Sequence, residues 1–526
     1  MADALDVVVR SFNINSKLGP KLKVAAEQNA ILRIGWTNAG DPVPKNGELG
    51  LCPGIPKGAK IRALGVLGSW AAAFGKGGTF TIQGDSGSFL GAGNDGNTIS
   101  CEKSAGNFVG YGMKSGKISV LDGCGDDAGS CMKGGHIFIR GNAGNRIGGG
   151  MSGGIIVIDG DIGNDPGAGM TGGKIIVNGR CPNPPAGVTL RPITAAELKD
   201  INKKIDDKDF EIPNDSICLE SSEDNPILPK NETVSSSDLS MIGLVPGDAP
   251  QKMNYTTCDT VALLGERDET NTPIALPLPL IPILSDGKIL SGVEGKKQII
   301  QGVIEKQPFM VNDNPREIDI LIVDTNNLHK LQDILKSSGG AVIDLMNLPN
   351  MTSEEIDGML VAIRTLLGRE KPFAFCDGIG RIDSLHKKSA YHQVDFSLCK
   401  IEDGTGISEP ASLPLIGRSM KSNLQNAHTD SAIMLGFSAN SQDVVKLCAS
   451  GLKIVCCSSP VEDAEEISQW LTQIQSELSS TLRRLGLDSI DSLSRQNLRA
   501  LDYETAAVSG LRLAGYERPL PHWFAR

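Results

Sequence analysis

The residues from Gly78 to Gly179 repeat one pattern every nineteen residues, and this period restricts the fold more than any other feature of the chain. Short apolar segments such as Ile118-Ser119-Val120 alternate with glycine-rich turns. Glycines recur at 87, 106, 125, 144 and 163, at 91, 110, 129, 148 and 167, and at 116, 135, 154 and 173, while methionines recur at 113, 132, 151 and 170. Series that stay in phase over this length indicate a structural repeat.

A period near twenty with one short strand in each unit is typical of a solenoid, because so small a unit cannot bury its own apolar face. The alternation predicts that Ile118 and Val120 face the interior and that Ser119 faces outward. Glycines suit corners, where the backbone has positive φ or where neighbouring coils leave no room for a Cβ. We therefore expect a right-handed parallel β-helix with about nineteen residues per coil. It begins before Gly78, since Ile61 stands one period before Phe80.

Composition narrows the class of protein. The 526 residues are too many for a single core, so two or three domains are expected. A net charge of −11 without a basic stripe argues against nucleic-acid binding. No apolar run is long enough to cross a membrane and the first residues do not resemble a signal peptide, which predicts a cytoplasmic protein. The twelve cysteines lack the spacing of metal ligands, so we expect reduced thiols and no metal site.

The chain divides into five predicted parts. Residues 1–58 are rich in turn residues and are expected to form an irregular cap, and residues 59–181 form the β-helix. Residues 182–257 contain a helix near 194–205 and a polar linker. Residues 258–459 alternate apolar and helical segments, which indicates βαβ units, and residues 460–526 are predicted to be a helical tail.

Seven segments of the fourth part are continuously apolar, as buried parallel strands are. They are 260–265, 318–323, 341–346, 372–376, 394–399, 431–436 and 452–457. Seven strands are one fewer than a TIM barrel needs, so a TIM-barrel-like domain, an incomplete barrel and an open sheet all remain open. Thr352 and Ser353 form a capping pair before one of the intervening helices.

The repeat also carries a family resemblance. The units GNAGNRIGGGMSGGIIVIDG and GDIGNDPGAGMTGGKIIVNG resemble the glycine-rich β-helix of the glutamate synthase large subunit. The same module forms one of the subunits of formylmethanofuran dehydrogenase, and one of those of the related formyltransferase/hydrolase complex. The resemblance covers about 120 residues and implies the fold. It does not imply an activity, because the module is not catalytic in those families.

The second half resembles the FMN barrel of glutamate synthase. The segment VDFSLCKIEDGTGISEP is similar to the family's Glu-Gly-Gly-Thr-Gly-Ala-Ala-Pro loop, and SAIMLGFSANS is similar to its strand and phosphate loop. Glycine-rich turns at helix starts can bind phosphate through backbone N–H groups. FMN, or another anion, is therefore a possible ligand of five candidate cofactor-binding residues: Gly404, Thr405, Gly406, Gly436 and Ser438.

Several departures from that family suggest a degenerate barrel. No cysteine follows Cys457, so we expect no iron–sulfur cluster. Only Ser285 and Gly287 match the Ser-x-Gly-Ala motif that lies over the flavin, the lysine-bearing substrate stretch is not recognisable, and the order of the two domains is reversed. The residue after Met1 is not cysteine, so the resemblance does not extend to the glutaminase domain.

Other candidate residues follow the predicted strand at 372–376. Asp377, Gly378, Gly380 and Arg381 lie where barrel chemistry usually takes place. Arg381 could bind a carboxylate, although it could equally be an ordinary surface residue. The nearby His386 and His392 have no third residue spaced as a metal ligand.

Two main hypotheses follow, and neither assigns a catalytic residue. In the first, the chain is a non-catalytic or vestigial glutamate-synthase-like subunit that scaffolds the other protein subunits of a metabolic complex, without a cofactor. In the second, it is an FMN-dependent oxidoreductase that uses ammonia from a partner glutaminase. A third possibility is the β-helical component of a formylmethanofuran dehydrogenase or formyltransferase/hydrolase complex. The missing cluster cysteines and the altered flavin motif favour the scaffold.

Overall fold

The computed structural model describes residues 2–35, 47–205, 211–222, 238–245, 274–293, 302–401 and 407–516. These residues form two compact units. The first unit comprises residues 1–230 together with 324–336 and 350–370, and the second comprises 231–323, 337–349 and 371–526. The chain therefore passes between the units more than once, and the units do not coincide with the five predicted parts.

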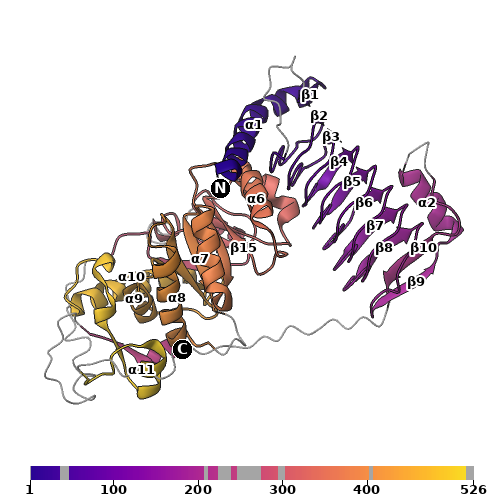
Figure 1. The fold of residues 1–526 in the computed structure, drawn as a ribbon. Coiled ribbons are helices and arrows are strands. Elements are labelled where there is room, and N and C mark those ends of the chain that lie inside the picture. Colours follow the sequence, from indigo (N-terminus) through magenta and orange to yellow (C-terminus); the bar gives the residue numbers. More distant parts are fainter. Residues whose placement is uncertain are drawn as a thin grey trace. The chain divides into compact units, whose positions relative to one another are not determined.

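Eight parallel strands stack in chain order in the first unit, as Figure 1 shows. They are β1 (Ile31–Ile34), β2 (Lys60–Leu64), β3 (Thr79–Gln83), β4 (Asp95–Cys101), β5 (Ser115–Val120), β6 (His136–Ile139), β7 (Ser152–Ile158) and β8 (Gly172–Val177). From β2 onward the register follows the repeat, so that Ile118 pairs with Ile137 and Ile137 with Ile156. Ile61 pairs with Phe80, as the period predicts.

The stack buries the residues that the alternation assigns to its interior. Ile118 and Val120 are fully buried, whereas Ser119 is partly exposed. The methionines at 113, 132, 151 and 170 also belong to this core. One aligned row of apolar side chains thus runs through successive repeats, and it buries the surface that a single repeat could not.

Both ends of the stack carry further elements. Two strands continue the sheet in antiparallel pairing, β10 (Ile217–Ser221) beside β8 and β9 (Val188–Pro192) beside β10. Helix α2 (Ala195–Ile205) packs with Phe138, Val157 and Ile176 on the outer face of the sheet.

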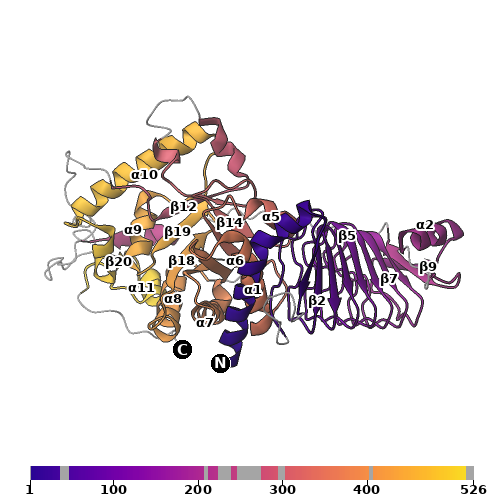
Figure 2. The same cartoon turned by 90° about the horizontal axis from the view of Figure 1, so that it is seen from above.

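The N-terminal segment is a helix, which corrects the expectation of an irregular cap. Helix α1 (Ala2–Glu27) contributes Ile14, Leu18 and Leu22 to the core of the stack, and Figure 2 shows it beside the first strands. These residues are four apart and line one face of the helix. Burial of this face stabilises a helix whose Gly19 and Pro20 disfavour helical structure.

The second unit contains a closed barrel of eight parallel strands. They are β12 (Leu280–Leu284), β13 (Met310–Val311), β14 (Ile320–Val323), β15 (Gly340–Asp344), β16 (Phe373–Gly378), β17 (Phe396–Lys400), β18 (Asp430–Leu435) and β19 (Ile454–Ser458). Pairing of Leu280 with Val455 closes the ring. Six of the seven predicted strands are present, and the predicted strand 260–265 lies outside the described residues.

The barrel is therefore complete, and the alternatives of an incomplete barrel and an open sheet are wrong. The sequence predicts only six of the eight barrel strands, because β13 has only two residues and β12 contains Pro282. Neither segment resembles a typical strand, and both are held by their neighbours in the ring.

Helices and turns connect the barrel strands. They are η3 (Gly287–Val293), η4 (Leu328–Lys330), α5 (Leu331–Ile334), α6 (Ser353–Leu367), η5 (Ile379–Arg381), α7 (Ile382–Tyr391), α8 (Glu409–Asn423), α9 (Ser441–Ala449) and α10 (Ala464–Arg484). Thr352 is the N-cap of α6, with Glu355 completing a capping box, so Ser353 is the first helical residue. The elements η4, α5 and α6 belong to the first unit.

The C-terminal tail is less helical than predicted. After α10 it consists of η6 (Ile490–Ser492), η7 (Arg495–Asn497), strand β20 (Leu498–Ala500) and α11 (Tyr503–Ser509). β20 pairs with β11 (Ile242–Leu244), which follows the turn η2 (Asp238–Met241). This pairing with a distant segment replaces the helix that the local sequence predicts.

Two expectations from composition can be compared with the described residues. Most of the eleven cysteines in these ranges are buried, as predicted, and none of the eleven belongs to a disulfide. Within the same ranges, no helix has both the length and the apolar character needed to cross a membrane.

Candidate functional site

Active sites of closed parallel barrels lie at the carboxyl ends of the strands. Val342, Cys376 and Leu398 belong to the apolar interior of the barrel. Side chains alternate along a strand, so the next inward positions on β15, β16 and β17 are Asp344, Gly378 and Lys400. We call these residues the mouth layer. It places a carboxylate and an ammonium group at one end of an otherwise apolar barrel.

Asp344 is held firmly in this layer. Its side chain is largely buried and accepts hydrogen bonds from the backbone N of Met346 (3.0 Å) and from Nδ2 of Asn347 (2.6 Å). Burial raises the pKa of the neighbouring Cys376 thiol well above its usual value, Asp344 raises it further, and Lys400 acts in the opposite direction. Asp344 and Lys400 are thus close enough to influence the same group.

Asp344 and Lys400 are not among the site residues predicted from the sequence. The signal that identifies them is the alternation within β15 and β17, extended by two residues beyond the last apolar position. Sequence alone does not show where each strand stops facing the core, so the polar residue at its end resembles the start of a loop.

Two of the five predicted cofactor-binding residues lie after β18. Gly436 is exposed, and Ser438 donates from Oγ to the backbone O of Ser458 at 2.8 Å. The other three, Gly404, Thr405 and Gly406, lie outside the described residues. Binding of FMN or another anion at these five positions stays a prediction.

A capping box formed by Asn440 and Asp443 pairs two backbone N–H groups at the start of α9. Asn440 Oδ1 accepts the backbone N–H of Asp443 (3.0 Å), and Asp443 accepts that of Asn440 (3.1 Å). Asp443 is 4% exposed, and burial raises the pKa of its carboxyl group. A phosphate at a helix N-terminus needs free N–H donors and no nearby carboxylate. The capping box occupies the N–H groups of Asn440 and Asp443 and places a carboxylate at this helix end, and both features disfavour a phosphate there.

Asp377 and Arg381 form an internal ion pair. Arg381 Nη2 lies 2.8 Å from Oδ1 of Asp377, which is almost fully buried. Burial raises the pKa of the Asp377 carboxyl group, while the Gly378 N–H and Arg381 lower it. The carboxylate that Arg381 binds is therefore one of the chain's own, and this role accounts for the residue without a ligand.

The two histidines of this region have structural surroundings. His386 is fully buried, with Nδ1 2.9 Å from Ser419 Oγ and Nε2 3.3 Å from Ser431 Oγ. Burial lowers its pKa to about 4, so the ring is neutral at pH 7. His392 stands edge-on to Phe375.

The motif residues after β12 also have a structural explanation. Ser285 is exposed, and Gly287 donates its N–H to Asp313 O at 3.0 Å. A Cβ at Gly287 would lie 2.1 Å from the carbonyl oxygen of Asn314, so only glycine permits this approach. The loop after β12 is thereby attached to the loop after β13.

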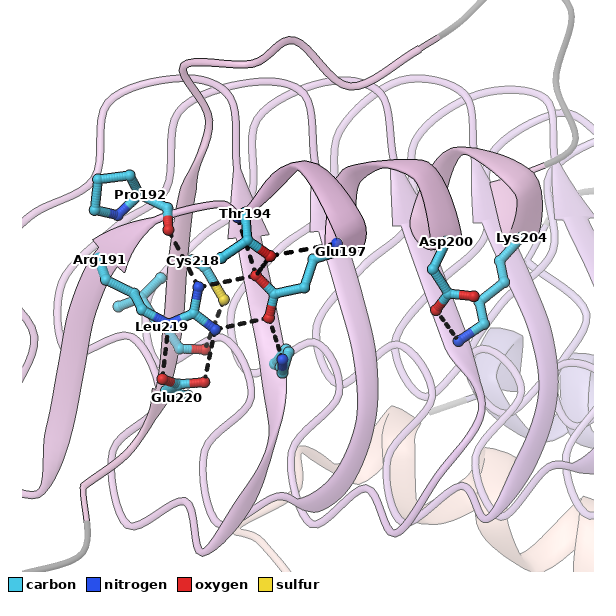
Figure 3. A network of polar contacts seen from close by, with 10 residues as sticks. Arg191, Pro192, Thr194, Glu197, Asp200, Lys204, Cys218, Leu219 and Glu220 are labelled. Atoms are coloured by element: carbon cyan, nitrogen blue, oxygen red, sulfur yellow. Dashed lines mark hydrogen bonds and ion pairs between the residues drawn. The ribbon is translucent and has the colours of Figure 1, made fainter.

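Figure 3 shows a charged network in the first unit, where Arg191 lies between two glutamates. Arg191 Nε is 2.7 Å from Glu220 Oε1, and Nη2 is 2.7 Å from Glu197 Oε1. Lys174 also pairs with Glu197. The contact with Arg191, followed by that with Lys174, lowers the pKa of Glu197 despite its partial burial.

Possible ligand atoms of Glu197, Cys218 and Glu220 lie within 4.8 Å of one another. The guanidinium of Arg191 already bonds both carboxylates, and burial raises the pKa of the Cys218 thiol and keeps it protonated. A metal ion would have to displace the arginine and deprotonate the thiol. We interpret the network as an ion-pair cluster that holds α2, β9 and β10 against β8.

A comparison with protein families identifies the glycine-rich repeat of the first unit. Residues 51–210 match the profile of a family described as "GXGXG motif". No curated protein sequence matches the chain.

Similar solved structures include flavocytochrome b2 mutants. One with bound sulfite is 14% identical over 50% of this chain and 81% of its own, with a TM-score of 0.35. Another with bound pyruvate is 15% identical over 50% and 81%, with a TM-score of 0.33.

Proposed function

We propose that this chain is a non-catalytic, glutamate-synthase-like subunit that acts as a scaffold for other protein subunits of a metabolic complex. The observation that carries the proposal is the start of α9, where a capping box occupies the N–H groups of Asn440 and Asp443 and places the Asp443 carboxylate at a helix end that would have to bind a flavin phosphate. The match of residues 51–210 to the GXGXG motif supports the relationship to glutamate synthase.

The repeat is suited to such a role. We propose that it forms a right-handed parallel β-helix, with β1 to β8 as one face of the coil. Bridges that run from Glu48 through Leu67, Ser86 and Ala105 to Cys124 support a second ladder with the same nineteen-residue step. Hydrogen bonds between successive coils at several positions make a stiff body. A stiff body with regularly spaced side chains can hold partner subunits at defined positions.

A second candidate is an FMN-dependent, glutamate-synthase-type oxidoreductase that takes ammonia from a partner glutaminase. The mouth layer favours it, since Asp344 and Lys400 lie where barrel enzymes bind their substrates. In this hypothesis Gly404, Thr405, Gly406, Gly436 and Ser438 hold the flavin. A third candidate, the β-helical component of a formylmethanofuran dehydrogenase or formyltransferase/hydrolase complex, is supported by the repeat alone.

The visible absorption spectrum of the purified chain distinguishes the first two candidates. The protein is incubated with excess FMN, desalted and measured, beside a sample without added flavin. The scaffold proposal expects no retained flavin in either sample. Stoichiometric yellow colour after desalting would overturn it in favour of the oxidoreductase.

The scaffold role itself is tested by purification from the native host under gentle conditions. We expect the chain to elute in a complex with other subunits, and the identity of those subunits separates glutamate metabolism from one-carbon metabolism. A colourless chain that elutes alone would contradict the scaffold role.

A further inference from the structure

The mouth layer of the barrel contains a lysine whose amine has no partner. Leu398 on β17 belongs to the apolar interior, so Lys400, two residues further along the strand, also faces inward. The Lys400 side chain is partly exposed, and within the described ranges no hydrogen bond or ion pair engages its Nζ. This amine is therefore available to a molecule that enters the mouth of the barrel.

The residues beside Lys400 leave room for a small ligand. Gly378 on β16 pairs with Lys400 and has no side chain, so nothing projects from β16 into the layer between Lys400 and Asp344 on β15. The floor below the layer is apolar and is formed by Val342, Cys376 and Leu398. A molecule above this floor contacts the lysine on one side and the aspartate on the other.

Asp344 can accept a further hydrogen bond. Its Oδ1 accepts from the backbone N of Met346, its Oδ2 accepts from Nδ2 of Asn347, and 8% of its surface is exposed. A carboxylate has about four acceptor sites, so these two bonds do not exhaust it. The carboxylate is therefore held in place and still able to bind a hydroxyl group.

The two charges of the layer select against charged ligands. Asp344 and Lys400 both influence the pKa of the Cys376 thiol, so both lie near that thiol. A carboxylate or phosphate bound to Lys400 would be repelled by Asp344, and a cation bound to Asp344 would be repelled by Lys400. A small neutral molecule with a carbonyl and a hydroxyl group avoids both repulsions. A lysine amine can also react with a carbonyl group and form an imine.

We propose that the mouth layer binds a small α-hydroxy aldehyde covalently, as an imine of Lys400, with the Asp344 carboxylate accepting a hydrogen bond from the neighbouring hydroxyl. The neutral amine adds to the carbonyl carbon, and the carbonyl oxygen takes up a proton from the nitrogen. Loss of this oxygen as water leaves the C=N bond. One aldehyde and one amine thus give one imine and one water, without an oxidant or a reductant.

This binding step is independent of the functions proposed above. It needs no flavin, so the absorption spectrum that separates the scaffold from the oxidoreductase does not test it. A scaffold subunit that binds an aldehyde reversibly would respond to a metabolite without turning it over.

The test traps the imine on the full chain with cyanoborohydride and locates it by peptide mass spectrometry. Lactaldehyde has the carbonyl and the hydroxyl, whereas 2-methylpropanal has a methyl group in place of the hydroxyl. Lys387 is the internal control, because it is exposed on α7 in the same unit. We expect lactaldehyde to modify Lys400 at a roughly tenfold lower concentration than Lys387, since the layer holds the aldehyde against the amine. With 2-methylpropanal this preference should be several times smaller.

Two substitutions assign the roles. Lys400→Arg keeps the charge but cannot form an imine, so the intact chain should lose the label that wild type gains first at low lactaldehyde concentration. Asp344→Asn keeps the shape of the side chain and weakens its bond to a hydroxyl. It should therefore reduce the labelling of Lys400 by lactaldehyde severalfold and leave the labelling by 2-methylpropanal unchanged.

Three results would overturn the proposal. The first is that Lys400 is modified no more readily than Lys387, which would mean that the layer does not hold the aldehyde. The second is equal labelling of Lys400 by the two aldehydes in wild type, which decides the role of the hydroxyl even if Asp344→Asn does not fold. The third is protection of Lys400 by millimolar inorganic phosphate, which would show an anion site instead.

Discussion

At the scale of single residues, the repeated glycines serve two physical purposes. Gly91 and the four glycines that follow it at nineteen-residue steps have positive φ, as does the series that begins at Gly116. Gly87 and its equivalents do not, but a Cβ at Gly87 would lie 2.7 Å from the backbone of Gly68. The first two series therefore provide backbone with positive φ, whereas the third allows one repeat to approach the next closely.

A pair of substitutions in one repeat tests the close approach. A Cβ at Gly144 would lie 2.7 Å from Asp126 N and 2.8 Å from Gly125 C, whereas at Gly149 its nearest contacts are at 3.2 Å. Neither glycine has positive φ. We expect Gly144→Ala to lower the free energy of unfolding by about 1–3 kcal/mol. Gly149→Ala should cost less than about 1 kcal/mol, measured by urea denaturation. Equal losses would contradict the role assigned to Gly144.

The buried His386 predicts a pH dependence of stability. Its pKa is about 4 in the folded chain, below the value of an exposed histidine, so the unfolded chain binds more protons between these values. The stability contribution is complete above about pH 6.5 and decreases as the pH falls toward 4.

We therefore compare the free energy of unfolding of wild type and His386→Gln at pH 7 and at pH 4. The wild type should lose roughly 3 kcal/mol more than the variant over this interval. Glutamine cannot be protonated, so it removes the titration while keeping a polar side chain. Parallel pH profiles for the two proteins would show that His386 can be protonated without unfolding.

At the scale of elements, the local sequence predicts the start of a helix correctly where neighbouring side chains cap its backbone N–H groups. Thr352 accepts the N–H of Glu355 and Glu355 accepts the N–H of Thr352, so α6 begins where the sequence predicts. The tail after α10 behaves differently, because β20 pairs with β11, more than two hundred residues away in the chain. A distant partner of this kind overrides local helix preference.

The start of α6 gives a direct test. Thr352→Ala should destabilise the protein by about 1 kcal/mol, because it removes the acceptor for the N–H of Glu355. The neighbouring Ser353 is the first helical residue, and Ser353→Ala should change the stability by less than about 0.5 kcal/mol. Thermal or urea unfolding of both variants measures the difference. A larger effect at Ser353 would mean that the helix begins one residue later.

At the scale of the whole molecule, the first unit is completed by segments that follow barrel strands β14 and β15 in the chain. Tyr111 Oη lies 2.7 Å from Thr325 Oγ1, and a Cβ at Gly358 would meet Ser69 O at 2.9 Å. Trp70 and Phe74 are fully buried. The repeat is therefore covered by residues that a boundary near 182 would assign to another domain.

This arrangement predicts that a fragment of residues 1–230 is incomplete. Removing segments 324–336 and 350–370 should uncover apolar side chains near Trp70, and the fragment should bind the dye ANS more strongly than the full chain. A peptide of residues 350–370 added to the fragment should reduce the signal, whereas a scrambled peptide should not. A fragment that binds no more dye than the full chain would show that the repeat is stable without these segments.

The sequence by itself determined the repeat, its register and its interior, because a strictly periodic chain presents the same local pattern in every unit. It also identified six barrel strands, since buried parallel strands are continuously apolar. The apolar residues of helix α1 recur on one face, which is typical of an amphipathic helix. Gly19 and Pro20 disfavour a helix, and for that reason the sequence predicts an irregular segment there.

Only the tertiary structure decided closure of the barrel, because β13 has two residues and its neighbours hold it in place. The same holds for the mouth layer, where Asp344 and Lys400 are brought to one rim of the barrel because β15 and β17 are parallel strands on either side of β16. It holds too for the start of α9, where the chain's own Asp443 carboxylate accepts a backbone N–H at the helix end proposed to bind a phosphate. Whether a backbone donor is free depends on which other parts of the chain reach it, and local sequence does not encode that.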